Sequence, residues 1–175
     1  MATTHQISIE DYLHTTYRPD CDYLDGEIEE RNGGEKEHSI TQAFFIKWFA
    51  TFEEQWRLEA CPEIRMRVAA TRVRIADIAV VPVGIPYEAV LSKPPVAVVE
   101  VLSPEDRVSR YHDRLDDSRR MGVQHVWVVD PMRSKAYDCS AADWQPVDEF
   151  RIAGTEVTIP LAKLWDKLAE IHQSR

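Results

Sequence analysis

The period of the hydrophobic positions changes along the chain and predicts both helices and strands. From residue 37 to about residue 59, large apolar side chains recur roughly every four residues, which is typical of one buried helix face. Residues 72–81, 96–102 and 123–131 are short, nearly continuous apolar runs, as in strands buried on both faces. Weaker patterns predict helices at 8–17, 103–122 and 161–173, and strands at 63–68, 134–139 and 155–160.

The order of these elements predicts two supersecondary units. Asp25-Gly26 lies between two alternating segments, which is a strong signal for a β-hairpin. The segments 96–102, 103–122 and 123–130 have the lengths of a strand, a crossover helix and a second, parallel strand. We therefore expect an α/β fold, with a mixed β-sheet flanked by helices.

Composition restricts the class of protein. The 175 residues are 44% hydrophobic and 29% charged, the balance of a globular domain with room for a core, so a single domain spanning residues 1–175 is expected. No apolar run approaches the ~20 residues that a membrane helix needs, so no membrane partner is expected. The cysteines Cys21, Cys61 and Cys139 lie far apart, which favours reduced thiols and a cytoplasmic location. The net charge of −9 counts against a large nucleic-acid footprint, although it allows a local basic patch.

Two acidic residues interrupt the apolar strands. Glu100 stands in the run "VAVVEVL" and Asp77 in the run "RIADIAVV". If these strands are neighbours in a suitable register, both carboxylates project into the same place. Two close carboxylates repel each other unless a cation neutralises them, and oxygen ligands suit Mg²⁺. Such an ion can activate water and stabilise charge at a phosphodiester.

A simpler interpretation applies to each acid alone. Polar residues within strands are commonly solvated or hydrogen-bonded, and Glu100 lies close to the loop that starts at Ser103. The presence of two such acids on successive predicted strands weakens this interpretation without removing it.

The order of several motifs resembles a known family. The motifs are "YLDGEIEE" (23–30), His38 at the start of a helix, "RIADIAVV" (74–81), "VVEVLSP" (98–104) and "GVQHVWVVDP" (122–131). Together they resemble the Uma family of bacterial restriction endonucleases, within the PD-(D/E)XK nuclease superfamily. The resemblance implies a restriction-endonuclease-like fold, a DNA substrate, and a homodimer.

The resemblance also assigns roles to residues. The metal-binding Asp of the superfamily falls on Asp77 and its second acid on Glu100, while the carbonyl of Val101 would complete the protein ligands of Mg²⁺ or Mn²⁺. Glu27 and Glu29 in the hairpin are candidate auxiliary acids. His38 is a further candidate, although a His near a helix N-terminus is more often structural.

The catalytic Lys of the superfamily is absent from its usual place. The position two residues after the second acid holds Leu102, and the helix position at which the Uma family carries its Lys holds Arg114. Arg can neutralise charge on a phosphate, but it cannot act as a base. Two functions therefore remain open: a metal-dependent endonuclease that hydrolyses DNA, with Asp77, Glu100 and Arg114 as catalytic residues, or a catalytically impaired DNA-binding or regulatory module.

Overall fold

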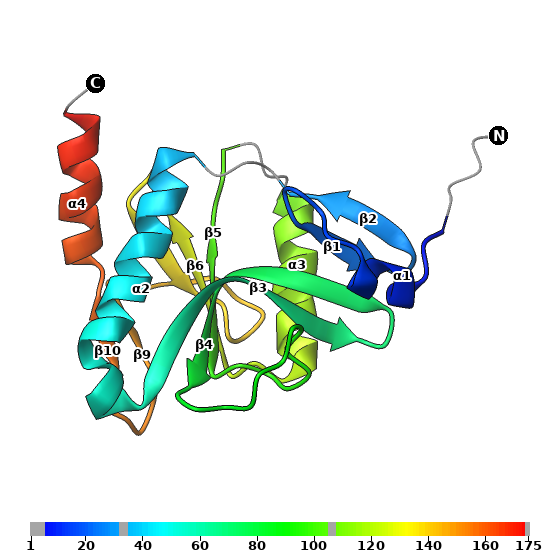
Figure 1. Ribbon diagram of the computed structural model, residues 1–175. Helices are drawn as coiled ribbons and strands as arrows, with labels where there is room; N and C mark the ends of the chain where they lie inside the picture. The colour runs from blue at the N-terminus through cyan, green and yellow to red at the C-terminus, as the bar shows by residue number, and fades with distance from the viewer. Residues whose placement is uncertain (1–5, 32–34, 105–107, 174–175) are drawn as a thin grey trace.

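The computed structural model describes residues 6–31, 35–104 and 108–173 and shows a mixed sheet with helices on both faces (Figure 1). The helices are α1 (Ile9–His14), α2 (Lys36–Trp56), α3 (Val108–Met121) and α4 (Ala162–His172). The strands are β1 (Cys21–Leu24), β2 (Glu27–Glu30), β3 (Leu58–Ala69), β4 (Arg72–Pro82), β5 (Ala97–Val101), β6 (His125–Asp130), β7 (Lys135–Asp138), β8 (Gln145–Pro146), β9 (Glu149–Arg151) and β10 (Thr158–Pro160). This arrangement confirms the expected α/β class.

Strands β1 to β8 form the main sheet, in the order β2-β1-β4-β5-β6-β7-β8 with β3 added beside β4. Strand β5 is parallel to β6 and α3 connects them, which confirms the predicted crossover unit. The β1–β2 hairpin turns at Asp25 and Gly26, whose φ values of 52° and 100° fit a tight turn with two left-handed residues.

The sheet separates two hydrophobic clusters, so the molecule has three layers (Figure 1). On one face, Phe45 and Phe49 of α2 and Leu164 of α4 pack against the sheet. On the other face, Leu115 of α3 packs against Ala79 and its neighbours. No helix in the described part of the chain is long and apolar enough to cross a membrane.

Several element boundaries differ from the sequence prediction, and β3 in particular starts at Leu58 rather than at residue 63. The long helix ends at Trp56 rather than near residue 59, because Arg57 adopts a left-handed conformation (φ 55°) and β3 starts at once, pairing with β4 from Leu58 onward. The sequence also predicts a helix that starts with Ser103 as its N-cap. In the structure Pro104 lies in a turn and the described helix begins at Val108; residues 105–107 lie outside the described part. The chain stays extended past β5, since the Leu102 amide bonds the Val129 carbonyl of β6 at 2.8 Å.

The central strand β4 has a gap in its pairing that positions the candidate site. One edge of β4 pairs with β3 along nearly its whole length. On the other edge, β1 pairs with Arg72 and Val73, and β5 pairs only from Ile78 onward. Among the described strands, none pairs with residues 74–77 on that edge, and their backbone groups need side-chain partners there.

Candidate functional site

Side chains close the gap between β1 and β5. Asp22 of β1 accepts a hydrogen bond from the Ile75 amide (2.9 Å), and Arg114 of α3 donates one to the Ile75 carbonyl (2.8 Å). Across the gap, Asp77 accepts one from the Val101 amide of β5 (2.8 Å). Charged side chains thus replace a regular strand ladder at this point, which is why so many are buried here.

The two acids singled out from the sequence lie next to each other on neighbouring strands. The ladder between β4 and β5 ends at the pair Ile78 and Val99, and Asp77 and Glu100 are the next residues on the two strands. Both are almost fully buried, with 2% and 1% of their surface exposed. The register places both carboxylates at the open end of this ladder.

The Asp77 carboxylate is held by positive groups. One oxygen accepts a hydrogen bond from Arg31, and the other lies 3.4 Å from Nε2 of His38. Burial would raise the pKa of Asp77, but the His38 hydrogen bond and the Arg31 charge outweigh it and lower that pKa to about 2. Asp77 is therefore ionised at neutral pH.

Glu100 is in the opposite state. Its nearest cation in the described structure is Arg114, whose Nη1 lies 3.5 Å from Oε2, a long contact. Burial, reinforced by the charge of Asp77, raises the pKa of Glu100 to about 8 despite the opposing charge of Arg114. At neutral pH Glu100 is therefore mostly protonated, and a further positive charge beside it would favour the ionised form.

Arg114 is a buried member of an ionic network. Besides Glu100 and the Ile75 carbonyl, it contacts the Asp22 carboxylate at 2.8 Å. Arg74 contacts the same Asp22 carboxylate at 3.0 Å and Asp117 at 2.8 Å. Burial opposes the charge of Arg114, but its acidic neighbours Asp22 and Glu100 raise its pKa further, so it stays protonated. The Arg114 side chain is buried.

Not all of the other residues that the resemblance assigns to the site lie beside Asp77 and Glu100. His38 contacts Asp77, as given above. The Val101 carbonyl accepts a hydrogen bond from the Tyr111 hydroxyl at 2.8 Å. Glu29 pairs with Arg74 (3.1 Å) and Arg110 (2.9 Å), and Glu27 is exposed at the start of β2, so the contacts of the described residues bring neither acid to Asp77 or Glu100.

Sequence reasoning missed several groups at the site. Arg31 bridges Asp77 and Glu63, while Gln42 donates to Glu63 (2.6 Å) and to the Asp77 carbonyl (3.0 Å). No local pattern marks these three residues. Asp22 was detectable, because it is an acid within the apolar stretch "CDYL", the same signal that singled out Asp77 and Glu100.

The donor set fits a hard divalent cation with few protein ligands. Among the described residues, no group of three or more His, Cys, Asp and Glu side chains is arranged to hold a metal. The candidate ligands are instead two carboxylates and one backbone carbonyl, from Asp77, Glu100 and Val101, which is an all-oxygen set suited to Mg²⁺ with bound water. Burial raises the pKa of Glu100, and additional positive charge beside it would favour its ionised form.

Comparisons with known proteins agree with this fold. A protein from Anabaena variabilis ATCC 29413, described as "a putative nuclease belonging to DUF820", has a similar structure, with a TM-score of 0.79 and 18% sequence identity over 93% of this chain and 99% of that one. The class is therefore a nuclease-like α/β fold. Residues 9–154 match the model of the Uma2 family, described as "Putative restriction endonuclease", and the chain belongs to this family. No curated protein sequence matches the chain.

Proposed function

We propose that the protein is a metal-dependent endonuclease that hydrolyses phosphodiester bonds in DNA. The observation that carries the proposal is the pair of buried carboxylates, Asp77 and Glu100, at the open end of the ladder between β4 and β5. One is ionised and the other is held protonated by burial, so the site binds a cation by exchanging a proton for it. Family membership and the nuclease-like fold support the same activity.

Asp77, Glu100 and the Val101 carbonyl would hold Mg²⁺ or Mn²⁺. When bound, such an ion makes water more acidic and offsets negative charge at the phosphate. Arg114 holds Glu100 in place and neutralises part of the local negative charge. His38 orients the Asp77 carboxylate through the oxygen that Arg31 leaves free. Leu102 and Arg114, at the positions of the superfamily's Lys, cannot accept a proton from water, so we assign that step to no side chain.

The proposal extends to partners and location. DNA is the proposed substrate, and a second copy of the chain would allow both strands of a duplex to be cut. Cys21, Cys61 and Cys139 are free thiols, which supports the cytoplasm as the working compartment.

A second function is favoured by the contacts of Asp77. Both oxygens of this carboxylate already bond protein groups, and Arg114 is tied to Asp22 and to a backbone carbonyl. A site satisfied in this way suits a nuclease-fold protein that has lost cleavage and binds or regulates DNA.

A cleavage assay with matched variants separates the two functions. Purified protein is incubated with plasmid DNA in Mg²⁺, in Mn²⁺ and in chelator, and Mn²⁺ binding is measured separately by calorimetry. Cleavage that needs the metal and is lost in Asp77→Asn and Glu100→Gln, but retained in Glu27→Gln, supports the nuclease. Mn²⁺-dependent DNA binding without cleavage supports the second function, and an absence of metal binding rejects the assignment of Asp77 and Glu100.

A further inference from the structure

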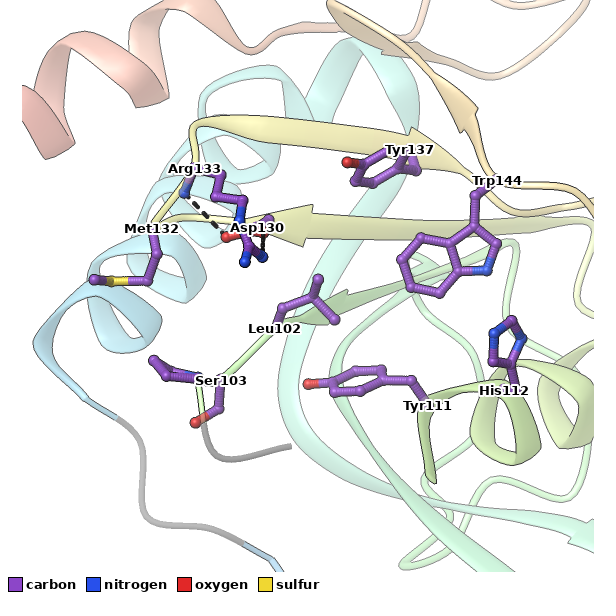
Figure 2. Close-up of a pocket in the computed structure, with 10 residues that line it drawn as sticks. Leu102, Ser103, Tyr111, His112, Asp130, Met132, Arg133, Tyr137 and Trp144 are labelled. Atoms are coloured by element: carbon purple, nitrogen blue, oxygen red, sulfur yellow. Dashed lines mark hydrogen bonds and ion pairs between the residues drawn. The ribbon is translucent and has the colours of Figure 1, made fainter. Parts of the chain in front are cut away.

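A pocket of about 650 Å³ opens immediately beyond β5, beside the candidate site (Figure 2). This volume lies within the range of pockets that enclose small organic ligands. The ionic network described above does not fill it, and none of the roles assigned so far uses it.

The pocket has an aromatic wall built from separate parts of the chain. Tyr111 and His112 come from α3, Tyr137 from β7, and Trp144 from the segment before β8. The Trp144 ring lies 5.7 Å from His112 and 5.4 Å from Tyr137 between centroids, tilted by 53° and 60°. Figure 2 shows these side chains gathered at one end of the pocket, with Leu102 beside them. Such a wall suits a flat aromatic ligand, because aromatic rings stack on planar π-systems.

Charged groups define another part of the pocket. Asp130, at the end of β6, pairs with Arg133 at 3.0 Å, and Arg133 has 76% of its side chain exposed (Figure 2). A guanidinium at the rim can contact a phosphate. Asp130 is buried and both its oxygens bond Arg133, so it holds that guanidinium at the rim. Aromatic faces and one cation together match a nucleotide better than a purely apolar ligand.

The pocket and the site of Asp77 and Glu100 both lie at the C-terminal end of β5. Leu102, which lines the pocket, follows Val101 directly, and the Tyr111 hydroxyl donates to the Val101 carbonyl at 2.8 Å while its ring lines the pocket. A nucleotide in the pocket would therefore lie beside the place where the proposed nuclease holds its phosphodiester. In a regular duplex the bases are stacked inside, so only an unpaired or extruded base could enter.

We propose that this pocket binds one unpaired nucleobase of a DNA strand, and that the preferred substrate is accordingly DNA with an unpaired nucleotide. The inference deepens the proposed function and rests on it for the position of the phosphate. Base binding itself does not depend on cleavage and can be measured without it.

The test compares two oligonucleotide duplexes in Ca²⁺, one fully paired and one with a single unpaired 2-aminopurine. We expect the wild-type protein to bind the second duplex at least about tenfold more tightly, with a change in 2-aminopurine fluorescence on stacking. Trp144→Ala should lose this preference and the fluorescence change, whereas Trp144→Phe should retain most of both. Tyr87→Ala is the matched control, since Tyr87 is 91% exposed and does not line the pocket.

Equal binding of the two duplexes by the wild type, or an undiminished preference in a folded Trp144→Ala variant, overturns the inference. Cleavage in Mg²⁺ is scored separately on both duplexes. If paired DNA is cut and Trp144 has no effect on binding, the proposed nuclease function is supported and the proposed base-binding pocket is rejected. If neither duplex is cut but Trp144-dependent binding of the unpaired base persists, the base-binding pocket is supported and the proposed nuclease function is rejected.

Discussion

Arg31 bonds one oxygen of the Asp77 carboxylate, which is one of the proposed metal ligands. Its guanidinium bridges Asp77 and Glu63 and is largely buried, with 14% of the side chain exposed. Burial opposes its charge, but the neighbouring carboxylates of Asp77 and Glu63 raise its pKa, so it is a permanent positive charge within the site. If Asp77 binds a metal ion as proposed, the ion and Arg31 would compete for the same carboxylate.

Removing this competitor should strengthen metal binding. We expect Arg31→Gln to lower the dissociation constant for Mn²⁺ by about tenfold, which corresponds to about 1.4 kcal/mol. Calorimetric titration of the wild type, Arg31→Gln and the exposed control Arg67→Gln measures the effect. Weaker Mn²⁺ binding by Arg31→Gln would show that Arg31 supports the site and does not compete for it.

The raised pKa of Glu100 predicts a specific pH dependence of stability. Between the pKa of an unfolded Glu, about 4.3, and the folded value of about 8, the folded state holds a proton that the unfolded state has released. The contribution of Glu100 to the free energy of unfolding is therefore fully present below about pH 4.3 and is lost as the pH rises to about 8. Between these values the free energy of unfolding falls by up to about 1.4 kcal/mol per pH unit.

Glu100→Gln should remove this slope. The free energy of unfolding of wild type and variant is measured with urea in chelator from pH 5 to pH 8.5, and their difference isolates Glu100 from other titrating groups. The free energy of unfolding of the variant should increase relative to that of the wild type as the pH rises. A difference that does not change across this range would mean that Glu100 is ionised in the folded protein.

Substitutions of Arg114 should change both the stability and the proposed nuclease activity. Arg114→Ala removes one of the two arginines that contact Asp22, and Arg74 remains, so the cost should lie at or below about 3–5 kcal/mol, the cost of breaking a buried pair. Arg114→Lys keeps the charge and introduces the Lys that the resemblance to the Uma family implies for this position, so it should lose less stability and preserve or raise the proposed metal-dependent cleavage. Urea unfolding and plasmid cleavage are measured on the same preparations. An Arg114→Lys protein that is folded and binds Mn²⁺ but cuts less DNA than the wild type contradicts this role.

At the scale of elements, the β1–β2 hairpin is attached to the sheet by few backbone contacts. Strand β1 pairs with β4 only at Tyr23 and Leu24, so Asp22 provides much of the remaining attachment through the Ile75 amide, Arg74 and Arg114. We expect Asp22→Asn to speed amide exchange in residues 21–30 far more than in β5 and β6, because local opening of the hairpin becomes easier.

Hydrogen exchange followed by mass spectrometry measures this difference. Glu29→Gln is the control, because Glu29 also contacts Arg74 but is 25% exposed and lies on the outer strand of the hairpin. Uniformly faster exchange across the whole chain would indicate that the hairpin and the rest of the sheet open together.

At the scale of the whole molecule, the net charge of −9 limits how the protein can bind DNA. Few phosphates can be neutralised by an acidic surface, so binding should depend on a small local contact area and on the divalent cation. We expect the logarithm of the DNA-binding constant to fall with the logarithm of salt concentration with a slope of about −2 to −4 in Ca²⁺, far shallower than the slope of about −10 of a strongly electrostatic binder. Fluorescence anisotropy between 50 and 200 mM salt tests this, and a slope near −10 would reveal a basic surface that the overall charge conceals.

The sequence alone determined the class of fold and the two central acids. The apolar runs of β4, β5 and β6 and the four-residue period of α2 are local signals, because burial on one or both faces sets the spacing of hydrophobic residues within each element. An acid within such a run conflicts with that spacing, which is why Asp77 and Glu100 could be recognised without coordinates. The predicted helix start near Ser103 is tested only in part, because Pro104 lies in a turn and residues 105–107 lie outside the described part of the chain.

The tertiary structure decided the ionisation states of these two acids. Whether Asp77 and Glu100 meet depends on the register of β4 against β5, and their opposite ionisation depends on Arg31 and His38 on one side and burial on the other. Arg31 is far from Asp77 along the chain, and its contact leaves no period or motif in the sequence. Charge interactions depend on distance in space and on the surrounding dielectric, and both are set only when the sheet and its helices have packed.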